Sequence, residues 1–85
     1  MLSVEVIFKK SAFKHGISKV DILSATTSFL FDGSMDSDEN KRLLLGFDTK
    51  SNLIEVMYEV IDEDRINIFH AMKARKALIA MVIRR

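Results

Sequence analysis

The chain has 85 residues, a formal net charge of +1, no proline and no cysteine. This length suits one small domain, residues 1–85, and a hydrophobic share of 48% excludes a linker or a disordered tail. Without cysteine, disulfides, thiolate chemistry and cysteine-based zinc sites are excluded, and neither a metal nor another cofactor is expected. No apolar stretch reaches the roughly 18 residues that cross a bilayer, so we expect a cytoplasmic protein with no membrane partner.

The charges are segregated along the chain. Residues 1–20 carry four lysines against Glu5, residues 21–64 carry eleven acids against three cations, and residues 65–85 carry six cations and no acid. The small net charge argues against binding to nucleic acid by bulk electrostatics. The basic final segment is nevertheless suited to an anionic substrate such as an RNA phosphate, although a solvated helix face is the commoner role of such a run.

The first elements are predicted to be a strand and a short helix. Val4–Phe8 is rich in β-branched and aromatic residues, which is typical of a strand. Lys9–His15 can form two helical turns. Gly16 then stands where a left-handed residue commonly ends a helix.

A second helix is predicted from Lys19 to about Phe29. Ser18 and Asp21 fit a variant of the capping box, which marks a helix start. The threonine and serine residues that follow lower the helix propensity and set its end. The residues expected in the core are spaced i, i+3 and i+7, namely Ile22, Ala25 and Phe29.

The middle of the chain predicts a loop and then an antiparallel meander. Asp32–Lys41 is polar and acidic without periodicity, so it is expected to be the longest exposed loop, and its acids do not match the spacing of a calcium loop. Three apolar runs follow, separated by short turn-like breaks: Leu43–Phe47, Leu53–Ile61 and Ile66–Met72. In the middle run, alternation assigns Ile54, Val56, Tyr58 and Val60 to the core and Leu53, Glu55, Met57 and Glu59 to a polar face.

The final segment, Lys73–Arg85, favours a helix. Nearly every position of residues 77–83 is apolar, so a strand is the alternative there. A helix would place Lys73, Arg75 and Lys76 in its first turn, where the macrodipole disfavours cations and an anionic ligand would offset them. The expected fold class is therefore α+β: a small antiparallel sheet of about four strands, packed by two N-terminal helices and a C-terminal helix.

Several short stretches resemble the BrnT family, the ribonuclease toxins of bacterial type II toxin–antitoxin pairs, whose fold is related to RelE. The matching residues are Lys14, His15, Gly16 and Ser18, then Arg42, Leu43, Leu44, Leu45 and Gly46, then Arg65 and Ile66, and finally Ala74, Arg75, Lys76 and Ala77. The resemblance implies a single BrnT-like domain and metal-independent cleavage of RNA by the ribose 2′-hydroxyl. It also implies a cognate antitoxin that covers the site.

The candidate site residues follow from the chemistry of metal-free RNA cleavage, which needs a base, an acid and cations beside the phosphate. His70, Arg75 and Lys73 are the predicted catalytic residues, and Arg65 and Lys76 the predicted substrate-binding residues. Strand alternation puts His70 on the face of Ile66 and Ile68, so a core histidine is an equally open interpretation.

Two further residues fall outside the predicted site: His15 is better explained by a helix end, and Tyr58 by the core. An alternative function is a non-catalytic binding or regulatory module of the same fold that pairs with a protein partner. In that case the apolar C-terminal segment is the expected contact, including contact between copies in a homo-oligomer.

Overall fold

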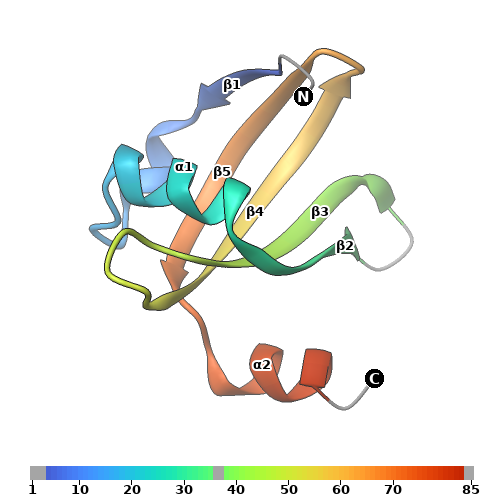
Figure 1. Cartoon of the computed structure of the whole chain (residues 1–85). Coiled ribbons are helices and arrows are strands. Elements are labelled where there is room, and N and C mark those ends of the chain that lie inside the picture. The colour runs from blue at the N-terminus through green and yellow to red at the C-terminus, as the bar shows by residue number, and fades with distance from the viewer. Residues whose placement is uncertain (1–3, 36–37, 84–85) are drawn as a thin grey trace.

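The structure, a computed structural model, describes residues 4–35 and 38–83. Within them, five strands form one mixed sheet accompanied by two α-helices and one 3-10 turn (Figure 1). The elements in chain order are β1 (Glu5–Phe8), the 3-10 turn η1 (Lys10–Phe13), α1 (Lys19–Thr27), β2 (Phe29–Met35), β3 (Asp38–Phe47), β4 (Leu53–Asp62), β5 (Arg65–Lys73) and α2 (Lys76–Ile83). The strand order is β1-β5-β4-β3-β2, with β1 parallel to β5 and the other neighbours antiparallel.

The expected fold class is wrong in the number and direction of its strands and in its helix count. The sheet has five strands because residues 29–35 form β2 instead of a helix end and a loop. β2 is an edge strand, so its polar residues need not face a core. β1 pairs in parallel with the distant β5, a pairing that local periodicity does not encode. The first expected helix is only the four-residue turn η1.

The helix start at Ser18 is confirmed. The backbone N–H of Asp21 donates to Ser18 Oγ at 3.2 Å, and α1 begins at Lys19. Gly16 has a φ of 82°, as the predicted left-handed position requires. Ile22 and Ala25 are fully buried, whereas Phe29 opens β2 and is half exposed, so its assignment to the core is wrong.

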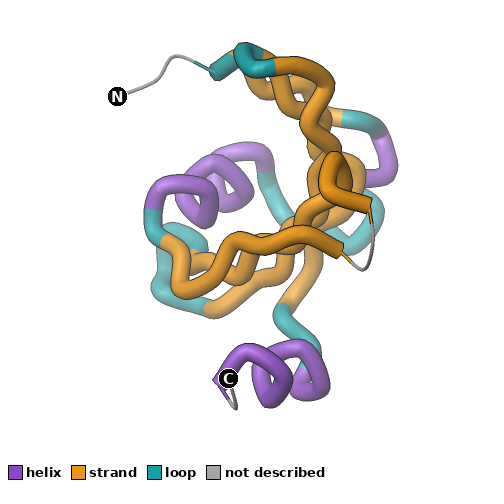
Figure 2. Tube along the Cα trace, turned by 90° about the vertical axis from the view of Figure 1, so that its right-hand side faces the viewer, coloured by secondary structure: helices purple, strands orange, loops and turns teal. Residues whose placement is uncertain are grey.

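The predicted meander is confirmed in β3, β4 and β5, which pair antiparallel in sequence order. The sheet is curved, with α1 on its concave side and α2 on its convex side (Figure 2). We call the face under α1 the inner face; Leu44, Val56 and Ile68 lie in the core there. The opposite, outer face carries Leu43 and Glu55.

Gly46 allows α1 to approach the sheet closely. A Cβ at this position would collide with the backbone oxygen of Ala25. The α1 helix is further tied to β3 because Ser24 Oγ donates to the carbonyl of Phe47 at 3.0 Å. Neither α1, with nine residues, nor α2, with eight, is long and apolar enough to cross a membrane, and the described residues hold no other α-helix.

The C-terminal helix is confirmed as a helix but starts later than expected. Lys73 is the last residue of β5, and α2 begins at Lys76. Residues 84 and 85 of the predicted helix lie outside the described residues, as do residues 36 and 37 of the predicted loop. No described residue of α2 is fully buried; Met81 and Ile83 are largely exposed.

Candidate functional site

Glu55 forms the centre of a polar network on the outer face. Its side chain has no solvent exposure. Glu55 Oε1 accepts from the backbone N–H and from Nε of Arg75, each at 3.0 Å, and Oε2 accepts from Nη2 of Arg75 at 2.6 Å. Oε2 also lies 2.9 Å from Nε2 of His70. One buried carboxylate therefore holds two of the predicted catalytic residues side by side.

The environment of Glu55 favours its charged form. Burial raises the pKa of the carboxyl, but the hydrogen bonds from the Arg75 side chain, from His70 and from the Arg75 backbone outweigh burial and lower the pKa below its ordinary value. In return, the hydrogen bond and the charge of Glu55 raise the pKa of Arg75. At neutral pH this pair is a fixed carboxylate and a fixed guanidinium.

A β-bulge at Phe69 places His70 on the outer face. Tyr58 pairs with Ile68, but its neighbour Met57 pairs with His70, so Phe69 is an extra residue in β5. The expectation that His70 shares a face with Ile66 and Ile68 is therefore wrong, because it assumed strict alternation. The bulge turns His70 away from the core and toward Glu55, and its side chain keeps 21% exposure.

A second imidazole lies beside His70. The ring of His15, in the turn after η1, meets that of His70 edge to face, with 5.5 Å between the centroids and 71° between the planes. A hydrogen bond to a charged carboxylate requires the proton of His70 on Nε2. In the neutral ring, Nδ1 is then the atom with a free lone pair. The arrangement offers one oriented imidazole and one exposed imidazole next to a guanidinium.

Hydrogen bonds at the start of α2 explain why the cation Arg75 lies at the N-terminus of this helix. The backbone N–H groups of Leu78 and Ile79 bond to the carbonyl of Arg75, so Arg75 stands at the position that caps the helix. The carboxylate of Glu55 accepts from the Arg75 N–H at this end of the helix. Glu55 therefore supplies negative charge at the N-terminus of α2, where the macrodipole favours an anion.

The other three predicted site residues, Lys76, Lys73 and Arg65, make no hydrogen bond or ion pair to Glu55 among the contacts of this network. Lys76 is exposed and adjoins Arg75 at the first position of α2. Lys73 pairs with Ile54, which lies in the inner core, so alternation puts Lys73 on the inner side at the end of β5. Arg65 stands at the opposite end of the strand. There it bonds to Asp62 at 2.8 and 3.0 Å and is not brought together with His70.

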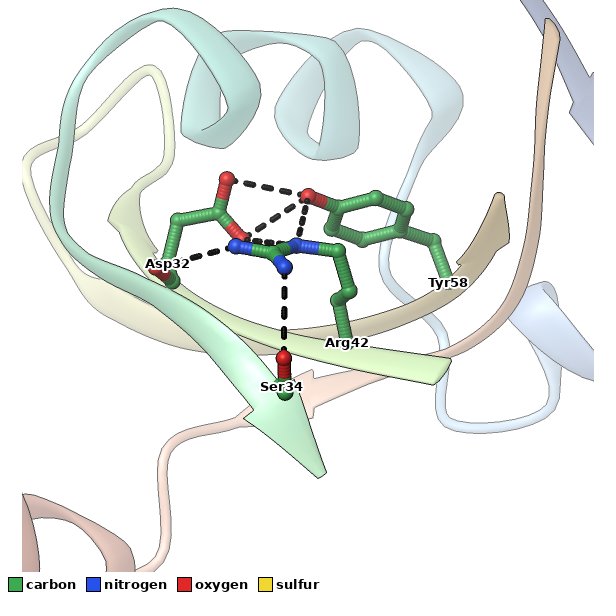
Figure 3. A network of polar contacts seen from close by, with 4 residues as sticks. All are labelled: Asp32, Ser34, Arg42 and Tyr58. Atoms are coloured by element: carbon green, nitrogen blue, oxygen red, sulfur yellow. Dashed lines mark hydrogen bonds and ion pairs between the residues drawn. The ribbon is translucent and has the colours of Figure 1, made fainter. Parts of the chain in front are cut away.

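The inner face carries a second network of a carboxylate, an arginine and a ring, shown in Figure 3. The hydroxyl of Tyr58 donates to the carboxylate of Asp32, at 2.8 and 2.9 Å from its two oxygens. Arg42 Nε lies 3.1 Å from that hydroxyl and 3.3 Å from Asp32 Oδ1, and Arg42 Nη1 lies 3.4 Å from Ser34 Oγ. These residues tie β2, β3 and β4 together.

The Tyr58 hydroxyl is a poor group for proton transfer near neutral pH. Burial, followed by its hydrogen bond to Asp32 and the charge of that carboxylate, raises the pKa of Tyr58 to about 12. A cavity of about 410 Å³ adjoins Asp32 and Tyr58, and its walls include Leu23, Phe29 and Ile66. Of the two networks, only the outer one contains an imidazole.

Glu55 and His15 are not among the site residues that the sequence predicts. Glu55 alternates with buried residues in a single strand, which predicts an exposed face. The neighbouring strand held a contrary signal, since Leu43, Leu44 and Leu45 are consecutive and all three are buried. A strand buried on both faces indicates that its neighbour is covered on both faces too. No such signal links His15 to His70, which lie 55 positions apart.

Comparisons with known proteins add no relative. No family model, no curated protein and no solved structure matches the chain.

Proposed function

We propose that the protein is a metal-independent ribonuclease that acts at the outer-face network, as the toxin of a bacterial toxin–antitoxin pair. One observation carries the enzymatic part: the buried Glu55 carboxylate holds His70 and Arg75 together, and the His15 ring lies 5.5 Å from that of His70. Two imidazoles and a guanidinium supply the base, the acid and the cation that cleavage by a 2′-hydroxyl needs.

The proposed reaction is an internal transfer at phosphorus. His70 Nδ1 takes the proton of the 2′-hydroxyl, the 2′-oxygen forms a bond to phosphorus, and the bond from phosphorus to the 5′-oxygen breaks. His15, protonated, gives its proton to the leaving 5′-oxygen. The products are a 2′,3′-cyclic phosphate and a 5′-hydroxyl, with no other reactant consumed.

Arg75 keeps donors for the phosphate while it is paired with Glu55. A guanidinium has five N–H donors, and Glu55 occupies Nε and one N–H of Nη2. The Arg75 side chain is 54% exposed. We assign its remaining N–H groups to the phosphoryl oxygens, with Lys76 as an additional charge nearby.

The toxin role rests on the resemblance to BrnT and sets the expected partners: RNA as substrate and a cognate antitoxin as inhibitor, both in the cytoplasm. Expression of the chain alone is expected to arrest growth and degrade RNA, and co-expression of a small protein encoded beside it is expected to restore growth. Growth without RNA loss would contradict the toxin role.

The enzymatic proposal is tested with purified protein and a short RNA in the presence of a chelator. We expect cleavage with cyclic phosphate and 5′-hydroxyl ends, and no cleavage where a 2′-deoxynucleotide replaces the nucleotide before the cut. The rate should follow a bell-shaped pH profile, because the base must be neutral and the acid protonated at the same time. Loss of cleavage in the chelator, or cutting at the deoxynucleotide, would contradict the mechanism.

The variant His15→Gln separates the two imidazoles in this profile. It should remove one limb of the bell and lower the rate by about 10²- to 10⁴-fold. His15 is exposed, so the fold should survive the change. An unchanged profile would exclude His15 as the acid.

A second candidate function, a binding module without catalysis, is favoured by the exposed apolar residues Met81 and Ile83 on α2. Such a module would pair with a protein partner or with a second copy through α2. Size-exclusion chromatography with light scattering distinguishes the cases for the free chain. A dimer that Met81→Lys converts to a monomer would support the pairing of copies, and a monomer in both forms would contradict it.

A further inference from the structure

A hollow of about 290 Å³ lies on the outer face beside the proposed catalytic residues. It is lined by Lys9, Ser11, Lys41, Glu59 and Phe69. Lys41 and Glu59 are direct partners across β3 and β4, on the same face as Glu55. Phe69 is the residue immediately before His70. The hollow therefore adjoins the site on the side away from Arg75.

The bulge in β5 connects the hollow to the site. The extra residue of a bulge locally suspends the alternation of side chains, so Phe69 and His70 are both turned to the outer face. Ser11 Oγ donates to the carbonyl of Phe69 at 2.6 Å, which fixes the bulge to η1. Any ligand that contacts the Phe69 ring is thereby held next to the His70 imidazole.

We propose that this hollow binds the base next to the scissile phosphate and prefers guanine, an inference that rests on the ribonuclease function proposed above. The half-buried Phe69 ring offers a surface on which a base can stack. Lys9 and Lys41 are exposed cations at the wall, suited to the neighbouring phosphates. Glu59 supplies a carboxylate that accepts hydrogen bonds from the edge of the base.

The carboxylate of Glu59 determines the preference for guanine. Guanine presents two adjacent donors on its pairing edge, N1–H and the N2 amino group, which match the two oxygens of Glu59. Adenine and cytosine present one donor beside an acceptor, and uracil presents one donor between two acceptors. An acceptor facing a carboxylate is repelled, so the other three bases bind less well.

The inference is tested by binding, independently of cleavage. Nucleoside 3′- and 5′-monophosphates of all four bases are titrated into the full-length protein and followed by NMR chemical shifts. We expect a guanosine monophosphate to bind about tenfold more tightly than the others and to shift the resonances of Phe69 and Glu59. Equal binding of all four bases, or shifts elsewhere on the protein, would overturn it.

Two variants complete the test. Glu59→Gln should weaken guanosine binding about tenfold and leave adenosine binding nearly unchanged, whereas Glu63→Gln, in the turn between β4 and β5, should change neither. Equal effects of the two variants would overturn the role of Glu59. Selective guanosine binding by a protein that cleaves no RNA would refute the ribonuclease function and keep the subsite. Cleavage without base preference would refute the subsite alone.

Discussion

The two faces of the sheet carry networks built from the same kinds of group. Strand β4 supplies one member to each: Tyr58 to the inner network with Asp32 and Arg42, and Glu55 to the outer network. Because these residues are three positions apart in a strand, they point to opposite faces. The inner ring is a phenol whose pKa is raised to about 12, whereas the outer ring is an imidazole. Similar carboxylate–arginine pairs thus hold different rings on the two faces: a phenol on the inner face, and on the outer face the imidazole that we propose as the reacting group.

The networks also differ in what they join. Asp32, Arg42 and Tyr58 come from three adjacent strands and fix the edge hairpin of β2 and β3. Glu55 instead joins β4 and β5 to the segment that leads into α2. Its partners His70 and Arg75 are partly exposed, at 21% and 54%. The inner network is suited to stability, and the outer one is where we propose the chemistry.

The largest stability effect is expected for Arg75→Ala. This change removes the two side-chain hydrogen bonds that Arg75 makes to the buried carboxylate of Glu55, so the free energy of unfolding should fall more than in the other variants. Urea denaturation gives the free energy of unfolding. Lys76→Ala is the matched control and should change it by less than about 0.5 kcal/mol. Equal losses in both variants would show that Glu55 does not depend on Arg75.

A smaller loss is expected for Tyr58→Phe. The phenyl ring keeps the packing but removes the hydroxyl that donates to Asp32, for a cost of about 1–3 kcal/mol. The same denaturation measurement applies. Stability equal to that of the unaltered chain would mean that the hydroxyl is not part of the network.

The pKa of Tyr58 can be read directly because the chain contains one tyrosine. Its near-ultraviolet absorbance should titrate at about 12, and Asp32→Asn should lower the midpoint toward the ordinary value of 10.0. Since the pKa of the folded protein is the higher one, this group stabilises the fold below pH 10.0 and the contribution is lost as pH rises toward 12. A midpoint near 10 in the unaltered chain would contradict the inner network.

The outer network predicts a loss of stability at acid pH, whereas the inner network predicts a loss at alkaline pH. The pKa of Glu55 is lower in the folded protein than its ordinary value of 4.5. Its contribution to stability is therefore present above pH 4.5 and is lost as pH falls through the lower, folded value. Denaturation at a series of acid pH values should show a decline that is shallower in Glu55→Gln. Identical slopes in both proteins would refute the ionised Glu55.

The sequence predicted the elements whose signals are local. The cap at Ser18, the turn at Gly16 and the three-stranded meander follow from neighbouring residues, and all are present. The parallel pairing of β1 with β5 was not predictable, because it joins residues 60 positions apart, such as Glu5 and Arg65. Strand alternation identified Tyr58 as core but failed at His70, where a single extra residue reverses the face.

The candidate site was predicted in part, since His70 and Arg75 came from a basic stretch of one segment. Lys73 and Arg65 are cations of the same basic segment, but strand geometry separates them from His70. Glu55 and His15 were missed because their contact with His70 depends on strand pairing and on the turn after η1. A site that assembles from three parts of a chain leaves no continuous motif to read.

The contrast between the two networks is tested most directly by measuring RNA cleavage in His70→Gln and Tyr58→Phe under conditions where both proteins remain folded. Glutamine can still donate to Glu55, so the fold is kept while the imidazole is lost. We predict that cleavage falls by about 10²- to 10⁴-fold in His70→Gln and by no more than a few-fold in Tyr58→Phe. Equal rates in the two variants, or a larger loss in Tyr58→Phe, would contradict the assignment of chemistry to the outer face.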